Sequence, residues 1–435
     1  MLRFFILYCI YNILFPIIFI LYFPFYLHKT KKRSQHQVNW KERVGILSRE
    51  QQQKIKENGN NTVWIHAVSV GEVNIACEFI KAWQIKAPHL FFVLTCTTNT
   101  ARLVLEKKQL YNTMICYNPI DIYICVAHFI HIIKPQKMII FEVEIWPNLL
   151  YICNKKSIPL YLVNGRLSKR SSYRFQKYHY FFAPLFRLFN KMILQSDTDK
   201  TRLLHVNKTL ESIHVVGNMK FDQKITIQNN DIPIKKYFCT HQDTIICLAS
   251  THAPEESLLL PIYLQLKESQ HHIKLIIVPR HQERTKEIIA LLKQHELTYQ
   301  LLTDYLNSKK EEHATIEVLI GNTTGDLTKL MSLSHIVFMG KSLVPFNNDG
   351  GHNILEPALL HKPIIQGKYT ENFQAITQQF IQQHAIMTIS SAEQFKDAVE
   401  TLITEAKETE KMVYNANMII QQHQGAIEKT LKLIE

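Results

Sequence analysis

The chain has 435 residues, 46% of them hydrophobic, and its formal net charge is +13. This length suggests about two or three domains, and the apolar content is ample for buried cores. The eight cysteines form no close pair and the 21 histidines are scattered, which argues against a disulfide framework and against a zinc site. The positive charge favours anionic lipid headgroups or a phosphorylated substrate. Nucleic acid is the rival explanation, but the basic residues are dispersed and no nucleic-acid-binding motif occurs.

The first predicted element is a membrane anchor helix. Residues 4–27 contain no charged side chain, and a helix of that length can span about 30 Å of hydrocarbon. A basic run at residues 28–33 follows, whereas only Arg3 precedes, so the positive-inside rule places the rest of the chain in the cytoplasm. The long apolar run argues against a cleaved signal peptide. Pro16 and Pro24 leave an alternative, a kinked helix that lies in one leaflet.

After about residue 60, short apolar strand candidates alternate with longer helical patterns. Such near-continuous apolar runs are typical of buried parallel strands. The first series of candidates is 62–67, 90–96, 137–141, 159–164, 192–195 and 214–217. The second series is 244–250, 274–279, 336–339, 363–366 and 386–389.

A polar stretch at residues 223–242 separates the two series and is the predicted linker. The predicted fold is therefore α/β, with two doubly wound Rossmann-like domains that face a cleft. The expected division is an anchor at 1–28, a first domain at 29–222 and a second domain at 243–435, with a helical tail from residue 392.

Ligands of doubly wound sheets bind beyond the carboxyl ends of the strands, so polar residues that directly follow a strand are the site candidates. Glu72 closes an S-x-x-E pattern at a helix start, where spacing alone favours a capping box and a general base is the alternative. Glu142 and Glu144 end another strand beside Trp146, where two buried carboxylates would need a function, and a solvated pair is the alternative. Lys220 follows the last strand of the first series, where an ordinary surface lysine is the alternative.

In the second series, Arg280 directly follows a strand. Its planar fork of donors suits a phosphate, although an ordinary surface arginine fits as well. Residues 321–326 open a helix as an anion-binding nest or as a plain turn. Asp197 and Asp199 match the D-x-D pattern of metal-dependent sugar transferases, but they stand at a helix start, where aspartates act as caps.

Two glycines, Gly350 and Gly351, precede a helix-like segment at 353–360. Glycines there allow a ligand close to the backbone, and the first helical turn attracts phosphate. Glu356 would accept hydrogen bonds from ribose hydroxyls, so the pattern indicates a nucleotide. The alternative is a glycine-rich loop in which Glu356 is a favourable first-turn charge.

Taken together and in this order, the segments resemble the Kdo transferases, the 3-deoxy-D-manno-octulosonic acid transferases of lipopolysaccharide assembly. The resemblance covers nearly the whole chain, and eight ordered motifs make it specific where each alone would be weak. The motifs are HAVSVGEV (66–73), EVEIWPN (142–148), NGRLS (164–168), GNMKFD (217–222), ASTH (249–252), VPRH (278–281), GNTTGDL (321–327) and GGHNILEP (350–357).

The resemblance implies an inverting glycosyltransferase of the GT-B fold that takes Kdo from CMP-Kdo. The implied acceptor is the glucosamine 6′-hydroxyl of a tetraacylated, phosphorylated lipid A precursor, to which one or more Kdo residues are added. Glu72 corresponds to the family's catalytic base, and Glu142 and Lys220 to its transition-state stabilisers. The implied CMP-binding residues are Pro279, Arg280, Thr324, Gly325, Asp326, Asn353, Ile354, Leu355 and Glu356.

Thr324 and Asp326 depart from the family pattern, which has Met and Glu there, so their side-chain contacts with CMP are less secure than the backbone contacts. No metal cofactor is expected, because positive charge and helix N-termini can stabilise the leaving phosphate. The expected location is the inner membrane with the catalytic domains on the cytoplasmic face, where anionic lipids and the lipid A precursor are partners and nucleic acid is not.

Two competing functions remain on sequence alone. One is a GT-B transferase that uses a UDP-sugar on a lipid carrier, which a CMP-versus-UDP titration would separate. The other is a non-catalytic, membrane-bound anion-binding protein, which has no use for Glu72 or Glu142.

Overall fold

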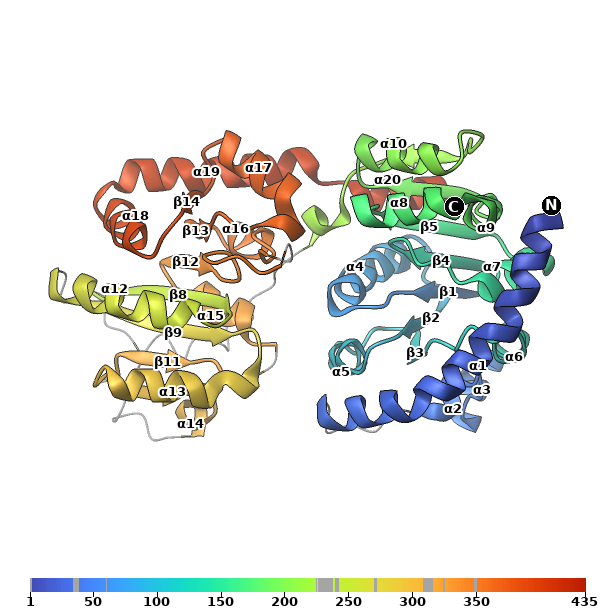
Figure 1. Cartoon of the computed structure of the whole chain (residues 1–435), viewed down its shortest axis with the longest axis horizontal. Coiled ribbons are helices and arrows are strands. Elements are labelled where there is room, and N and C mark those ends of the chain that lie inside the picture. Colours follow the sequence, from blue (N-terminus) through green and yellow to red (C-terminus); the bar gives the residue numbers. More distant parts are fainter. Residues whose placement is uncertain are drawn as a thin grey trace. The chain divides into compact units, whose positions relative to one another are not determined.

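The computed structural model describes residues 2–33, 39–59, 61–223, 225, 238, 242–269, 272–307, 316–323, 325–347 and 350–435. The chain forms two compact units (Figure 1). The first comprises Met1–Gln223 and His423–Glu435, and the second comprises Lys224–Gln422. Most of the predicted linker at 223–242 lies outside the described residues.

The first unit is built on a seven-stranded parallel sheet with the order β3-β2-β1-β4-β5-β6-β7. Side chains alternate along each strand between two cores: β1 places Trp64 in one core and Val63 and Ile65 in the other. The strands are β1 (Thr62–His66), β2 (Phe91–Cys96), β3 (Thr113–Tyr117), β4 (Lys137–Phe141), β5 (Leu160–Gly165), β6 (Lys191–Leu194) and β7 (Ile213–Val215).

Helices cover both faces of this sheet, as a sheet with buried faces requires. They are α2 (Trp40–Arg43), α3 (Arg49–Asn58), α4 (Val70–Lys86), α5 (Asn99–Lys107), α6 (Tyr123–Ile133), α7 (Pro147–Lys155), α8 (Lys169–Lys177), α9 (His179–Phe186), α10 (Asp197–Val206) and the 3-10 turn η1 (Met219–Asp222).

The C-terminal helix α20 (Ala426–Ile434) also belongs to the first unit. Ile427, Leu431 and Ile434 are buried in the same core as Val63 and Ile65. The sequence-based division had assigned the whole tail to the second domain, and for residues 423–435 this was wrong. Local periodicity shows that α20 has an apolar face but not which core that face joins.

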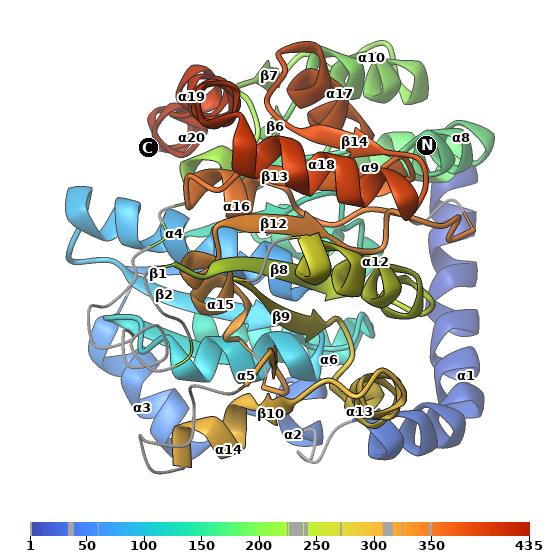
Figure 2. The same cartoon turned by 90° about the vertical axis from the view of Figure 1, so that its left-hand side faces the viewer.

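The second unit contains another seven-stranded parallel sheet, with the order β10-β11-β9-β8-β12-β13-β14. Figure 2 shows β13, β12, β8 and β9 side by side in its centre. The strands are β8 (Thr244–Thr251), β9 (Ile273–Pro279), β10 (Tyr299–Leu301), β11 (Val318–Ile320), β12 (Ile336–Met339), β13 (Ile364–Gly367) and β14 (Met387–Ile389).

The helical elements of this unit are α12 (Glu255–Ser269), η3 (Gln282–Arg284), α13 (Thr285–Gln294), α14 (Leu302–Asn307), α15 (Leu327–Leu333), α16 (Leu355–Leu359), η4 (Glu371–Phe373), α17 (Gln374–Gln382), α18 (Glu393–Thr404) and α19 (Ala406–His423). The prediction of two parallel α/β sheets is confirmed. Three strands were missed, namely β3, β10 and β11. The last two have three residues each, too few to show a pattern.

Helix α1 (Leu2–Arg33) continues through both prolines. Its segment Leu2–Phe25 is long and apolar enough to cross a membrane, so it is compatible with a membrane anchor. It runs along the outside of the first unit (Figure 1), and aromatic contacts join it to that unit near both ends: Phe4 lies 6.1 Å from Phe181 of α9, and Phe23 lies 4.7 Å from Trp40 of α2, between ring centroids.

The side chains of α1 divide into two faces. An aromatic stripe at helical spacing is at least partly covered: Phe4, Tyr8, Tyr11, Phe15, Phe19 and Phe23. The other face carries exposed aliphatic and aromatic side chains, including Leu2, Phe5, Ile6, Ile13, Ile17, Ile20 and Leu21. The protein therefore covers one side of the helix and leaves an apolar side for another partner.

Candidate active site

The topological switch point of the first sheet lies between β1 and β4, which are direct neighbours, with His66 at the end of β1 opposite Ile140 of β4. Glu72 follows β1 in the first turn of α4, and Glu142 directly follows β4. Ligand crevices of open α/β sheets form at this place, because neighbouring connections leave in opposite directions. The fold thus brings together two of the predicted catalytic residues.

Glu72 is buried, with 8% of its surface exposed, and forms the predicted capping box with Ser69. Its Oε2 accepts from the backbone N–H of Val68 at 2.8 Å, and its Oε1 accepts from the Ser69 hydroxyl at 2.6 Å and from the Ser69 N–H at 3.3 Å. Burial raises the pKa of Glu72, and the nearby charge of Glu142 raises it further. The carboxylate therefore caps the helix and has an increased affinity for a proton.

A third carboxylate, Glu144, lies in the same group. Burial raises its pKa to about 7, and the charges of Glu72 and then Glu142 add to this rise, while a hydrogen bond that Trp146 Nε1 donates at 3.0 Å opposes it. Glu142 has a left-handed backbone with φ 55°, and its N–H donates to Val163 O at 3.0 Å. The turn after β4 thus carries two glutamates whose charges interact with that of Glu72. Such a concentration of negative charge is typical of a functional site.

Lys220 lies in the 3-10 turn η1, which is fixed from both sides. The Asn218 side chain caps the turn by accepting from the Lys220 N–H at 3.0 Å, and the Met219 N–H donates to Asn164 Oδ1 at the end of β5 at 3.0 Å. On the other side, Asp222 accepts from the backbone N–H of Ile427 at 2.6 Å. The turn is therefore anchored to the strand next to β4, which places Lys220 on the same sheet edge as the carboxylates.

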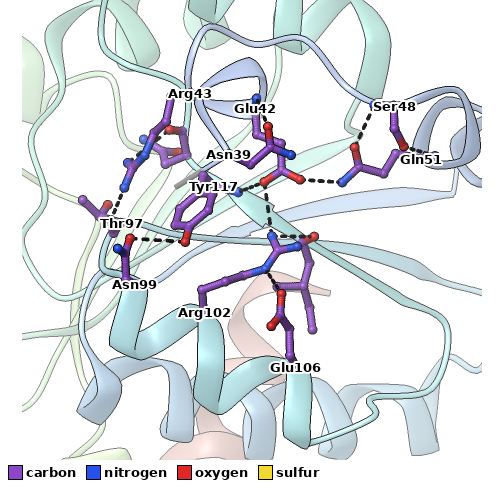
Figure 3. A network of polar contacts seen from close by, with 12 residues as sticks. Asn39, Glu42, Arg43, Ser48, Gln51, Thr97, Asn99, Arg102, Glu106 and Tyr117 are labelled. Atoms are coloured by element: carbon purple, nitrogen blue, oxygen red, sulfur yellow. Dashed lines mark hydrogen bonds and ion pairs between the residues drawn. The ribbon is translucent and has the colours of Figure 1, made fainter. Parts of the chain in front are cut away.

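A buried polar network supports this edge from the side of β2 and β3 (Figure 3). Glu42, which is 2% exposed, accepts from Arg102 Nη1 at 3.2 Å and from the Tyr117 N–H at 2.8 Å. Arg43 donates to the carbonyl of Thr97 and lies 4.7 Å from the centre of the Tyr117 ring. Because each buried charge has close partners, the network holds α2 against the loops after β2 and β3.

In the second unit, the polar residues beyond the strands form a cationic group. Arg280 is exposed directly after β9, and its N–H donates to Thr251 O at 3.0 Å. His252 follows β8, and its ring centroid lies 5.4 Å from that of His281 and 5.5 Å from that of His352. The pKa of His252 is lowered to about 4, chiefly by burial. The charge of Lys341 and of further cationic neighbours, among them Arg280, also lowers it. This group suits an anion.

The loop before α15 carries the next predicted residues. Gly325 is exposed with φ 100°, and the Asp326 carboxylate accepts from the Thr323 hydroxyl. Asp326 makes no capping hydrogen bond to the helix that it precedes. Thr324 lies outside the described residues.

The expected nucleotide loop at Gly350 and Gly351 has a different structure. The helix that follows has only five residues, and a Cβ at Gly350 would lie 2.7 Å from Tyr369 O, while one at Gly351 would lie 2.9 Å from Thr370 Cα. The glycines therefore permit close packing of the chain on residues 369–371, which is the alternative of a glycine-rich loop, while nucleotide binding at this place stays a prediction. A sequence of two glycines before a helical segment does not reveal whether a ligand or another segment of the chain lies against the glycines.

Downstream, Ile354 and Leu355 are fully buried, whereas Asn353 and Glu356 are partly exposed. The Asn353 amide donates to Glu356 Oε1 at 3.2 Å, and Asn353 Oδ1 accepts from the Leu355 N–H at 3.3 Å. Of these four predicted residues, only Asn353 and Glu356 present side chains that could contact a ligand, and each already helps to orient the other.

The D-x-D pattern is structural. Asp199 is 4% exposed, and its Oδ1 accepts from the Leu167 N–H at 2.8 Å, while Ser196 is the helix cap. Among the described residues, no group of three or more His, Cys, Asp or Glu side chains could hold a metal ion. The described cysteines are free thiols, and Cys239 lies outside the described residues.

Sequence reasoning named Glu144 beside Glu142 as a candidate but gave it no role in the reaction, and it did not assign the three histidines to the site. The E-x-E spacing after β4 was the available signal for Glu144, since alternate residues can return to the same side of a turn. His252 and His281 each follow a strand directly, which was the same signal as for Arg280. Their meeting with His352 depends on sheet order, which no local pattern provides.

Comparison with known proteins identifies a family and several similar chains. The family described as 3-deoxy-D-manno-octulosonic-acid transferase (kdotransferase) matches residues 38–223. A 3-deoxy-D-manno-octulosonic acid transferase of Haemophilus influenzae is 29% identical over 379 residues, which cover 86% of this chain and 86% of that protein. A bifunctional glycosyltransferase/methyltransferase of Fusobacterium nucleatum is 32% identical over 357 residues, covering 80% of this chain. This chain spans only 54% of that protein's length.

Among solved structures, a UDP-GlcNAc 2-epimerase from Neisseria meningitidis, bound to UDP-GlcNAc, aligns with a TM-score of 0.57 over 83% of this chain and 99% of that chain. At 15% sequence identity, this likeness shows the fold alone, which is the GT-B-like fold of two parallel α/β units. The family match and the relatives aligned along most of the chain show more: this chain belongs to the 3-deoxy-D-manno-octulosonic acid transferase family of glycosyltransferases.

Proposed function

We propose that the chain moves Kdo from CMP-Kdo to the glucosamine 6′-hydroxyl of a tetraacylated, phosphorylated lipid A precursor, with inversion at the anomeric carbon. Family membership supports the reaction class and the donor. Within the chain, the proposal depends chiefly on the group of interacting carboxylates, Glu72, Glu142 and Glu144, at the switch point of the first sheet. A protein that only binds anions gains nothing from such a group.

In the proposed reaction, Glu72 removes the proton of the attacking hydroxyl while the new bond to the anomeric carbon forms and the bond to the CMP phosphate breaks. The negative neighbours of Glu72 raise its proton affinity, which makes its ionised form a stronger general base. Glu142 stabilises the positive charge that develops on the sugar ring, and Lys220 stabilises negative charge on the departing phosphate.

The second unit supplies the donor-binding groups in this proposal. Arg280 and Lys341 give positive charge near the neutral imidazole of His252, and Arg280 can bind a phosphate with two parallel hydrogen bonds. The backbone of Gly325 and the side chains of Asn353 and Glu356 would hold the nucleoside. Because these cationic side chains can neutralise the leaving group, we propose that transfer needs no metal ion.

The exposed apolar face of α1 supports attachment to a membrane, and we place the enzyme on the cytoplasmic face of the inner membrane, where the basic chain is attracted to anionic lipids. When membranes that contain the chain are incubated with CMP-Kdo and the acceptor, the acceptor should gain the mass of one or more Kdo residues, as measured by mass spectrometry. Full activity in the presence of a chelator, and in the Asp197→Asn variant, should accompany this result. Transfer from a UDP-sugar but not from CMP-Kdo would refute the proposal.

A further inference from the structure

Helix α1 makes specific polar contacts with the first unit, in addition to its apolar ones. Tyr8 is 7% exposed, and its hydroxyl donates to Asn148 Oδ1 at 2.6 Å. The Tyr11 hydroxyl donates to Asp121 Oδ2 at 2.8 Å. Hydrogen bonds of this length to two buried acceptors fix the position and rotation of the helix, which a helix that serves only as a tether does not need.

The two acceptors meet at the N-terminus of α7. Trp146, at the cap position of α7, makes no side-chain capping bond. Instead the Asp121 carboxylate accepts from the backbone N–H groups of Asn148 at 3.0 Å and Leu149 at 2.9 Å. The Asn148 amide in turn donates to Asp121 O at 2.7 Å. Asp121 and Asn148 are both almost completely buried, so their partners within the protein satisfy them.

The first turn of α7 is also the far end of the turn that carries the carboxylates. Pro147 is the first residue of α7, and Trp146 directly before it holds Glu144 by a hydrogen bond. At the near end, Glu142 is fixed to β5 through its N–H. The segment from Glu142 to Asn148 therefore has two attachments, one to the sheet and one to a cap that α1 completes.

We infer that Tyr8 and Tyr11 are positioning residues: by completing the cap of α7, they hold the segment Glu142–Asn148 in the arrangement that transfer requires. The anchor helix is thus a structural part of the acceptor-side site. The inference rests on the proposed function in assigning catalysis to this segment, but the contact between α1 and α7 is independent of it.

The test uses the full-length chain in detergent, with Tyr11→Phe as the main variant. This change keeps the ring and removes the hydroxyl, so Asp121 keeps its burial and loses one partner. We expect hydrogen exchange of the Asn148 and Leu149 amides to accelerate about tenfold, since loss of a buried hydrogen bond to a charged group changes a local opening equilibrium by at least that factor. Tyr22→Phe is the matched control, because Tyr22 lies on α1 with 49% of its surface exposed.

Turnover is measured on detergent-dispersed acceptor, where membrane tethering does not limit the rate. We expect kcat to fall by up to about tenfold in Tyr11→Phe, because the lost hydrogen bond favours the competent arrangement of the segment Glu142–Asn148 over alternative closed arrangements by about that factor. The KM for CMP-Kdo should stay unchanged, because the donor motifs lie in the second unit. Tyr8→Phe should act in the same direction and provides a second variant if Tyr11→Phe fails to fold.

Unchanged amide exchange, or faster exchange with normal kcat, would overturn the inference. An effect of equal size in Tyr22→Phe would do so as well. If the unsubstituted chain transfers no Kdo, the proposed function fails, and the exchange measurement still decides whether α1 holds the cap of α7.

Discussion

Asp222 accepts a hydrogen bond from the backbone N–H of Ile427 at 2.6 Å, across 205 residues of sequence. The same carboxylate also accepts from the N–H of Gly425, so it caps the N-terminus of α20 while it ends the turn that carries Lys220. A carboxylate at a helix N-terminus satisfies unpaired N–H groups and favours the helix dipole. The C-terminal helix and the Lys220 turn therefore hold each other in place.

Asp222→Ala should lower the free energy of unfolding of the first unit by about 1–2 kcal/mol, because it removes a helix cap. It should also lower kcat, since the Lys220 turn loses an attachment. Urea denaturation and initial-rate kinetics measure the two effects. Asp197→Ala changes an exposed first-turn aspartate of α10 and serves as the control. A stable Asp222→Ala variant with normal turnover would contradict the role given to α20.

Glu72→Gln separates the capping role from the general base. The amide cannot take a proton, so transfer should fall about 10²–10⁴-fold, while CMP binding, measured by titration calorimetry, should stay intact. Ser69→Ala provides the comparison, because it removes the hydroxyl of the capping box and keeps the carboxylate. If Ser69→Ala loses as much activity as Glu72→Gln, the cap and not the proton transfer is what catalysis needs.

Glu144 should make the stability of the first unit depend on pH. Its pKa is about 7 in the folded chain, against 4.5 for an unperturbed glutamate, so the folded state binds more protons than the unfolded state between these values. Stability that is fully present below about pH 4.5 is therefore lost as pH rises through about 7. The Glu144→Gln variant should show a flatter profile in denaturation at a series of pH values. Parallel profiles for both proteins would mean that Glu144 ionises normally.

Arg280→Ala should raise the KM for CMP-Kdo about tenfold or more, with a smaller effect on kcat, because a guanidinium–phosphate contact acts in the ground state and in the transition state alike. Arg280→Lys should recover part of the affinity, since it keeps the charge and loses the fork of donors. Donor kinetics that are the same in all three proteins would place Arg280 outside the site.

Arg102→Met tests the network around Glu42. It leaves the Glu42 carboxylate buried with one charged partner fewer, which should lower the free energy of unfolding by about 2–4 kcal/mol. Lys54→Met is a suitable control, because the Lys54–Glu50 pair is exposed and such pairs contribute little. Equal midpoints of denaturation for the two variants would show that the network is not a main source of stability.

The sequence predicted those parts of the fold and site that depend on local pattern. Apolar runs such as Lys137–Phe141 identified central strands, and S-x-x-E at Ser69–Glu72 identified both the helix start and the cap. Where long-range packing decides the outcome, prediction failed. The apolar face of α20 could have packed on either unit. At Gly350, glycine is needed because residues 369–371 pack closely against it. The aromatic stripe of α1 was hidden among other apolar residues, because burial against protein and burial in lipid require the same hydrophobicity.

The place of α20 in the first unit has a consequence for biosynthesis. Chains are made from the N-terminus, and domains generally fold as units in that order. Here residues 423–435, which complete the core and the Lys220 turn of the first unit, leave the ribosome after the whole of the second unit. The second unit, Lys224–Gln422, is fully synthesised before the first unit can close its own core. A chain that stops before residue 423 would thus lack part of the core of the first unit, although its second unit would be complete.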